Sequence, residues 1–182
     1  MRIVSGFLKG RRFEMPSSKW KTRPTTDYAK ESLFNILTHR IELEGIQVLD
    51  LYAGTGNLSY EFASRGASQV LAVERYGACV KYIQENVKSF NLEDIIQVRK
   101  QDSLQYVRQS QEQFDVIFAD PPYADSKYTT LVNLILEGLL LQPEGLLIVE
   151  HDSRQNFANH SNFVELRQYG QSYFSFFAHQ PS

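Results

Sequence analysis

The sequence predicts an α/β fold with a mostly parallel, seven-stranded sheet, helices on both faces and an antiparallel C-terminal hairpin. Three observations carry this prediction. Five short apolar runs alternate with helix-length stretches from residue 46 onward, which is the pattern of parallel strands joined by helical crossovers. Two further runs near the C-terminus alternate polar and apolar residues around a Tyr-Gly-Gln turn. A chain of 182 residues that is 42% hydrophobic suffices for one well-buried core, so we expect one domain with an appendage.

The five apolar runs are the expected parallel strands. They are IQVLDLY (46–52), QVLAVE (69–74), IIQVRK (95–100), FDVIFA (114–119) and GLLIVE (145–150). The expected helices between them span 57–67, 77–90, 103–111 and 129–140. The two alternating runs, within 162–179, are expected to form the hairpin at the edge of the sheet.

An N-terminal extension precedes this pattern. The stretch RIVSGFLKGRRFEMP is punctuated by Gly6 and Gly10, which is typical of a short hairpin. Pro24 and the Thr25-Thr26-Asp27 cluster then predict the start of a helix. The apolar face of this helix is expected to consist of Leu33, Phe34, Ile36 and Leu37.

We expect an N-terminal extension (1–44) followed by the body (45–182), and the charge of the chain is concentrated unevenly between its first 30 residues and the rest. Residues 1–30 contain eight Lys or Arg against two Asp or Glu, a net charge of +6, while the whole chain has a net charge of −2. The rest of the chain therefore carries a net charge of −8. A basic arm on an acidic body favours a polyanionic partner, because Lys and Arg that displace counterions from phosphates supply most non-specific affinity for nucleic acids. A merely solvated, basic N-terminus is the alternative.

Cysteine and histidine usage argues against a disulfide framework and a metal site. Cys79 is the single cysteine, and we expect it to pack on a helix. The four histidines show no metal-ligand spacing and are expected at the surface; they are His39, His151, His160 and His179. The N-terminus lacks the apolar core of a signal peptide, and no long apolar run predicts a membrane span. We therefore expect a cytoplasmic protein, acting as a monomer and without a metal.

Acidic residues follow four successive strands of the predicted sheet. Asp50 lies near the end of the first strand, Glu74 ends the second, Asp102 follows the third and Asp120 follows the fourth. Ligands of such sheets bind beyond the carboxyl ends of the strands, where the strand order reverses. One such acid is commonplace as a helix cap or solvated loop residue, but four in succession indicate a binding site.

The loop DLYAGTGNL, after the first strand, indicates the ligand. Gly54 and Gly56 permit tight turning and close approach of the backbone, but Ser59 stands where a dinucleotide fingerprint requires glycine. Asp50 would repel a pyrophosphate, yet it suits a ligand with an ammonium group. Glu74 is placed to accept from both ribose hydroxyls, and Asp102 with Ser103 to bind an adenine edge. A nucleoside with a cationic amino-acid tail is S-adenosylmethionine.

The segment FADPPYADS, after the fourth strand, predicts the chemistry. An exocyclic amine of a nucleobase is a poor nucleophile, because its lone pair is delocalised into the ring. The carboxylate of Asp120 and the carbonyl of Pro121 can accept the two amine hydrogens, which favours a pyramidal nitrogen. Pro121 and Pro122 stiffen the turn and remove competing N–H donors, while Tyr123 offers a face for the base to stack on. No metal is required.

With these motifs the chain resembles the class I S-adenosylmethionine-dependent methyltransferases, which have a Rossmann-like fold. More narrowly, it resembles the bacterial RsmD family of small-subunit ribosomal RNA guanine-N2 methyltransferases. The resemblance runs nearly end to end. It rests on RIVSGFLKGRRF, TRPTTDYAKESLFNIL, DLYAGTGNL, VLAVE and the tetrapeptide DPPY. The segment TRPTTD after a basic arm is the most specific of these features.

The resemblance implies a role for each motif. It places the target amine at Asp120, Pro121, Pro122 and Tyr123. It places the cofactor at Asp50, Tyr52, Ala53, Gly54, Gly56, Glu74, Asp102 and Ser103. It places RNA, either free or in an assembling small subunit, at Arg2, Lys9, Arg11, Arg12 and Arg23. Two alternatives stay open: an N6-adenine methyltransferase acting on DNA or RNA, and a non-catalytic RNA-binding or ribosome-assembly factor.

Overall fold

The computed structural model describes residues 1–14, 25–122 and 127–180. Tyr123 and Arg23, both predicted to belong to the site, lie outside the described residues. The helices are α1 (Asp27–Arg40), α2 (Asn57–Ser64), α3 (Gly77–Ser89), α4 (Ser103–Gln109) and α5 (Tyr128–Glu137). The strands are β1 (Gln47–Leu51), β2 (Gln69–Glu74), β3 (Ile96–Lys100), β4 (Phe114–Ala119), β5 (Leu141–His151), β6 (Phe163–Tyr169) and β7 (Ser172–Phe177).

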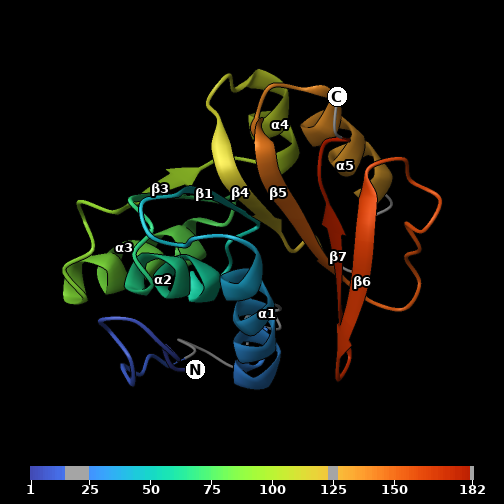
Figure 1. Cartoon of the computed structure of the whole chain (residues 1–182). Helices are drawn as coiled ribbons and strands as arrows, with labels where there is room; N and C mark the ends of the chain where they lie inside the picture. The colour runs from blue at the N-terminus through green and yellow to red at the C-terminus, as the bar shows by residue number, and fades with distance from the viewer. Residues whose placement is uncertain (15–24, 123–126, 181–182) are drawn as a thin grey trace.

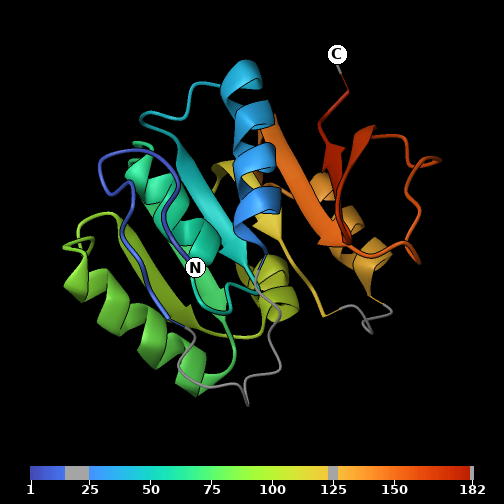
Figure 2. The ribbon, with the colours of Figure 1, turned by 90° about the horizontal axis from the view of Figure 1, so that it is seen from below.

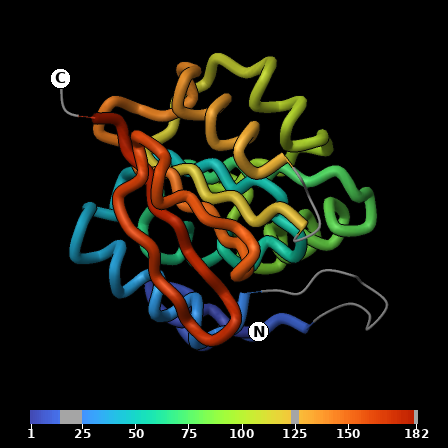
Figure 3. The backbone as a smooth tube through the Cα atoms, turned by 90° about the vertical axis from the view of Figure 1, so that its right-hand side faces the viewer, coloured from blue at the N-terminus to red at the C-terminus, as the bar shows by residue number. Residues whose placement is uncertain are grey.

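The strands form one seven-stranded sheet in the order β3-β2-β1-β4-β5-β7-β6. Neighbours from β3 to β5 pair in parallel, and β7 runs antiparallel to both β5 and β6. The predicted mostly parallel sheet with a C-terminal hairpin is therefore confirmed, and the hairpin lies along one side of the molecule (Figure 3). The strand order reverses between β1 and β4, so a ligand is expected beyond the carboxyl ends of these two strands.

Helices cover both faces of the sheet, as Figure 1 shows. Buried side chains of α1, α2 and α3 share one apolar cluster with one face of the strands. The buried side chains of α4 and α5 form a second cluster with the opposite face. The long, continuous apolar character of β1 and β4 follows from this double coverage, because strands buried on both faces have no solvent side to carry polar residues.

The N-terminal arm, residues 1–14, forms the expected hairpin in its shortest form, with one antiparallel bridge between Arg2 and Arg12. It packs along α2, as Figure 2 shows. Ile3, Leu8 and Phe13 enter the same core cluster as α1 and α2. The arm is therefore part of the core of the body, and the division at residue 44 stays a prediction.

Two local expectations differ from the structure. Strand β5 begins at Leu141 and runs through Pro143, with a register shift against β4, whereas the sequence placed its start at Gly145. His151 is fully buried, so the expectation of a surface histidine is wrong there. Its ring nitrogens lie 2.8 Å from the Asp152 carbonyl and 2.8 Å from Ser175 Oγ, and these two partners satisfy the buried imidazole.

Candidate active site

The carboxyl end of the sheet carries acids on four neighbouring strands. The register pairs Asp50 with Phe118 of β4, and Ala119 of β4 with Val149 of β5. Since side chains alternate between the two faces of a sheet, Asp50, Glu74 and Glu150 point to the face covered by α1, α2 and α3. Asp120 follows β4 with the same alternation. The acids of β1, β2, β4 and β5 therefore converge at one corner of the fold.

The glycine loop after β1 is held by hydrogen bonds to β2. Glu74 Oε2 accepts from the Gly54 amide at 2.9 Å, and its Oε1 accepts from the Tyr76 amide at 2.8 Å. The Ala53 amide donates to the Val73 carbonyl at 3.1 Å. A carboxylate oxygen has more than one acceptor position, so Glu74 orients the loop and keeps capacity for a further donor.

Tyr52 and Gly56 show why this loop needs its particular residues. Tyr52 adopts a left-handed conformation (φ 59°), which is uncommon for a residue with a large side chain. Its amide donates to Ser103 Oγ at 3.1 Å, so the loop contacts the start of α4. Gly56 (φ 78°) precedes α2, and a Cβ there would lie 2.7 Å from Tyr60 Cζ. Backbone conformation and space therefore both require glycine.

Asp50 lies beneath the loop and is 2% exposed. Ser59 Oγ donates to Asp50 Oδ2 at 2.5 Å, so the serine that breaks the dinucleotide fingerprint is bonded to the acid before the glycines. Burial raises the pKa of Asp50 to about 7; the Ser59 hydrogen bond opposes this shift and the charge of Glu74 adds to it. The ionised form of Asp50 is therefore destabilised until a positive charge lies nearby.

Asp102 and Ser103 lie where the sequence placed them, at the junction of β3 and α4. Asp102 caps α4, accepting from the Gln105 amide at 3.0 Å, and its Oδ2 lies 4.0 Å from Arg75. Ser103 is buried and bonded to the glycine loop through Tyr52. The helix cap alone accounts for an acid at position 102, so its contact with an adenine stays a prediction.

Asp120 stands at the centre of the acidic corner. Burial raises its pKa well above the usual range, and the negative charges of Glu150 and Asp50 raise it further. Within the described residues, no Lys or Arg side chain lowers the pKa of either Asp50 or Asp120. Among the described residues, the side chains that shift these two pKa values by their charge are acids, so these residues concentrate negative potential at the corner.

The turn after Asp120 is bonded to α5. Pro121 is buried and Pro122 is exposed. The Pro121 carbonyl accepts a hydrogen bond of 2.9 Å from the hydroxyl of Tyr128, which is 1% exposed. The carbonyl predicted to hold an amine hydrogen is thus already oriented by a neighbour.

Sequence reasoning missed Glu150 and its partner Thr25. Glu150 is 2% exposed and Thr25 is 4% exposed, and Thr25 Oγ1 donates to Glu150 Oε2 at 2.5 Å. The Thr25 carbonyl in turn accepts from Asn57 Nδ2 at 3.0 Å, at the start of α2. One signal was available, because GLLIVE ends in the same Val-Glu pair as QVLAVE. No feature of the sequence indicated the contact between Glu150 and Thr25, since 125 positions separate the two residues.

The basic arm is anchored by a buried ion pair that the sequence also did not reveal. Lys30 Nζ lies 3.2 Å from Glu61 Oε2, and both side chains are fully buried. Glu61 accepts from the amides of Val4 and Ser5, while Lys30 donates to the Arg2 carbonyl. These bonds fix the path of the arm over α2.

The predicted RNA-binding side chains of the arm are exposed. Arg2, Lys9, Arg11 and Arg12 all face solvent, and Arg2 also lies 3.5 Å from Asp27. The start of the arm lies near the glycine loop, because Met1 Sδ is 3.8 Å from Thr55 Oγ1. The tip lies at the far end of α2, where Leu8 donates to Ser64 Oγ.

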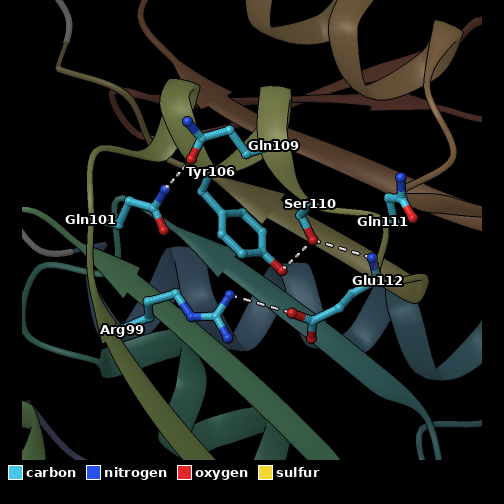
Figure 4. Close-up of a pocket in the computed structure, with 7 residues that line it drawn as sticks. All are labelled: Arg99, Gln101, Tyr106, Gln109, Ser110, Gln111 and Glu112. Carbon is cyan, nitrogen blue, oxygen red and sulfur yellow. Dashed lines mark hydrogen bonds and ion pairs between the residues drawn. The ribbon is translucent and has the colours of Figure 1, made fainter.

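A pocket lies apart from this corner, beside α4 and the edge strand β3 (Figure 4). It is lined by Arg99, Gln101, Tyr106, Gln109, Ser110, Gln111 and Glu112. Its polar groups pair with one another: Gln101 donates to Gln109 at 3.1 Å, and Arg99 lies 3.3 Å from Glu112. It contains none of the predicted site residues.

Neither a metal-binding cluster nor a membrane-spanning helix is present in residues 1–14, 25–122 and 127–180. Among those residues, no cluster of three or more His, Cys, Asp or Glu has an arrangement that could hold a metal ion. No helix among them is long and apolar enough to cross a membrane. Cys79 is buried as expected, and burial raises the pKa of its thiol to about 11, which disfavours a nucleophilic thiolate.

Known proteins resemble this chain over nearly its whole length. A family described as conserved hypothetical protein 95 matches residues 1–178. A Bacillus subtilis protein, provisionally named as an rRNA methyltransferase, is 36% identical over 84% of this chain and 83% of its own length. The ribosomal RNA small subunit methyltransferase D of Haemophilus influenzae is 31% identical over 92% of this chain and 87% of its own. A solved Escherichia coli structure, provisionally named as a methyltransferase, is 25% identical with a TM-score of 0.83 and covers 99% of both chains.

The family match spans the arm, the glycine loop and the acidic corner together. The chain belongs to the RsmD family of small-subunit ribosomal RNA methyltransferases.

Proposed function

We propose that this protein transfers a methyl group from S-adenosylmethionine to the N2 amine of a guanine in small-subunit ribosomal RNA. The observation that carries the proposal is Asp120, a partly buried acid directly after β4, followed by a stiff proline turn and flanked by the acids of β1 and β5. The chain belongs to a family whose relatives are named as small-subunit rRNA methyltransferases, and this supports ribosomal RNA as the substrate.

The acidic corner fits a cationic cofactor. S-adenosylmethionine supplies an activated methyl group and carries positive charge on its sulfonium and ammonium groups. Asp50 is buried with a raised pKa, so a positive charge beside it favours the ionised carboxylate and relieves the cost of burial. Glu74 would bind the ribose hydroxyls with the acceptor capacity left after it orients Gly54. Tyr52, Ala53 and Gly56 would line the same ligand.

Asp120 and the Pro121 carbonyl would hold the target amine. Two acceptors for the two amine hydrogens draw the nitrogen toward a pyramidal geometry and direct its lone pair at the methyl group. Because Tyr128 orients the Pro121 carbonyl before substrate binds, this acceptor needs little reorganisation at the moment of transfer. Alignment of this kind contributes about 7 to 11 kcal/mol in well-oriented reactions. Pro122 and Tyr123 would support the base, which must be unpaired or flipped out of its stack.

The basic arm would bind the RNA backbone. Arg2, Lys9, Arg11 and Arg12 are exposed on a segment that the Lys30–Glu61 ion pair and the Ser64 contacts hold in place. A cationic surface of fixed shape places phosphates reproducibly relative to the acidic corner. Arg23, which follows the arm in sequence, is proposed to belong to the same surface.

A deletion strain tests the proposal and its alternatives. Mass spectrometry of small-subunit RNA from a strain lacking this protein should show one N2-methylguanine missing, and the native gene should restore it. If every N2-methylguanine remains while an N6-methyladenine disappears, the adenine alternative replaces the proposal. If an Asp120→Ala gene cures the phenotype of the strain without restoring the methyl group, the role is that of a non-catalytic assembly factor.

A further inference from the structure

Two buried tyrosines donate hydrogen bonds to backbone carbonyls of the candidate site. Tyr60, on α2, donates to the Thr55 carbonyl of the glycine loop at 2.9 Å. Tyr128, the first residue of α5, donates to the Pro121 carbonyl at 2.9 Å. We infer that Tyr128 is a positioning residue for the target amine and Tyr60 its counterpart for the cofactor. This inference rests on the proposed function, in which the glycine loop binds the cofactor and the proline turn binds the target amine.

Tyr128 holds the proline turn at its base. Its ring is 1% exposed in the cluster between the sheet and α5, and lies edge-on to the ring of His151 with centroids 6.5 Å apart. Proline has no N–H, so the carbonyl is the only backbone hydrogen-bonding group of Pro121. A hydroxyl fixed by a packed ring therefore sets the direction of this carbonyl and joins the two described ends of the loop.

The hydrogen bond from Tyr128 sets the direction of the Pro121 carbonyl and does not make its oxygen a stronger acceptor. A carbonyl oxygen has two lone pairs, of which Tyr128 occupies one, leaving the second for an amine hydrogen. Accepting the first bond makes the oxygen a slightly weaker acceptor for the second, so the benefit of Tyr128 is in alignment. Misplacement of a reacting group by about 1 Å can cost about 100-fold in rate, while cofactor binding elsewhere is unaffected.

Tyr60 does the equivalent for the glycine loop. Its side chain is fully buried against Gly56, where a Cβ would lie 2.7 Å from the ring. Burial raises the pKa of Tyr60, so the hydroxyl stays protonated and donates. Its bond to Thr55 holds the turn that brings Gly54 and Gly56 to the ligand. Loss of this bond should weaken cofactor binding and leave the transfer step intact.

Matched Tyr→Phe variants of the full chain test the inference. The two readouts are the dissociation constant of S-adenosylmethionine, by calorimetry, and the single-turnover rate at saturating cofactor on RNA from the deletion strain. Tyr128→Phe should lower the rate about tenfold or more and change the dissociation constant less than twofold. Tyr60→Phe should raise the dissociation constant about tenfold and leave the saturated rate within about threefold.

Tyr106→Phe is the control, because Tyr106 is equally buried and its hydroxyl is bonded to Ser110, 3.0 Å away in the pocket of Figure 4. It should change neither readout. An unchanged rate in Tyr128→Phe overturns the inference, as does a similar loss of both readouts in both variants. If Tyr128→Phe does not stay folded, 3-fluorotyrosine at position 128 retains the hydroxyl and must retain the native rate; a tenfold loss there also contradicts the inference. A wild-type enzyme that binds cofactor but methylates no RNA contradicts the proposed function instead.

Discussion

The two halves of the carboxyl edge are built differently. In the half around β1, β2 and β3, three bonds join residues close in sequence: Ser59 with Asp50, Tyr60 with Thr55, and Gly54 with Glu74, which are 9, 5 and 20 positions apart. A fourth bond, from Tyr52 to Ser103, joins residues 51 positions apart. The half around β4 and β5 depends on Thr25, which binds Glu150 from 125 positions away. Both halves thus contain local bonds, but the proposed cofactor half has no bond as distant in sequence as the Thr25–Glu150 bond, which joins the proposed base half to the segment before α1. The Thr25–Glu150 bond therefore ties the end of β5 to the segment that follows the arm in sequence.

The largest effect is expected from Asp120→Asn, which should affect one half only. The neutral amide keeps one acceptor oxygen but loses the negative charge, which should lower the rate of methyl transfer about 100- to 1,000-fold, a magnitude typical for loss of one preorganised electrostatic contact. The dissociation constant of S-adenosylmethionine should change little. Radiolabel incorporation and calorimetry measure the two quantities. Asp115→Asn, at the opposite end of the same strand, is the matched control. Equal damage to cofactor binding would contradict a division of labour.

A pH titration sharpens the account of the cofactor half. Burial raises the pKa of Asp50 to about 7, so below that pH the carboxyl is mostly protonated and a cation must displace the proton to bind. The affinity for S-adenosylmethionine should therefore increase with pH between 6 and 8, by up to about tenfold per pH unit below the pKa. Asp50→Asn should bind more weakly and lose most of this dependence. An affinity of the wild type that is flat over this range would show that Asp50 does not face the positive charge.

Thr25→Val breaks the long-range contact. The valine keeps the buried volume but leaves Glu150 without its hydroxyl donor, which should reduce the free energy of unfolding by about 1–3 kcal/mol. We expect a several-fold loss of transfer rate with little change in cofactor affinity. Urea unfolding and single-turnover assays measure these effects. Thr38→Val, on the exposed side of α1, serves as a control that should be nearly neutral. Loss of cofactor affinity in Thr25→Val would argue against a boundary between the halves.

The smallest effect is expected on the arm. Lys9→Gln removes one exposed positive charge without touching the core, so RNA affinity should fall modestly at every sequence. A plot of the logarithm of the association constant against the logarithm of salt concentration should become less steep, by the amount that one phosphate contact contributes to its slope. Lys81→Gln, on the exposed face of α3, should leave that slope unchanged. Equal slopes for the native protein and the Lys9→Gln variant would show that Lys9 does not contact RNA.

The contrast between local and long-range contacts also explains which features the sequence predicted and which it did not. The position of Asp50, Glu74 and Asp120 at one edge of the sheet was predictable, because strands and their ends are read from local periodicity and parallel register brings those ends together. Glu150 was missed although it ends its strand in the same way. The Lys30–Glu61 pair and the Thr25–Glu150 bond join distant segments, so composition and spacing carried no signal of them. His151 was misplaced for the same reason, because its partner Ser175 lies on β7.

The central claim, methylation of a guanine N2 amine in small-subunit RNA, is tested most directly by following a labelled methyl group. RNA from the deletion strain would be offered both free and as assembled small subunits, with labelled S-adenosylmethionine, and the labelled nucleoside identified after digestion. The account predicts label in N2-methylguanine, abolished by Asp120→Asn, and the better substrate would reveal the stage of assembly at which the enzyme acts. Label in another nucleoside, or none in either substrate despite measurable cofactor binding, would contradict it.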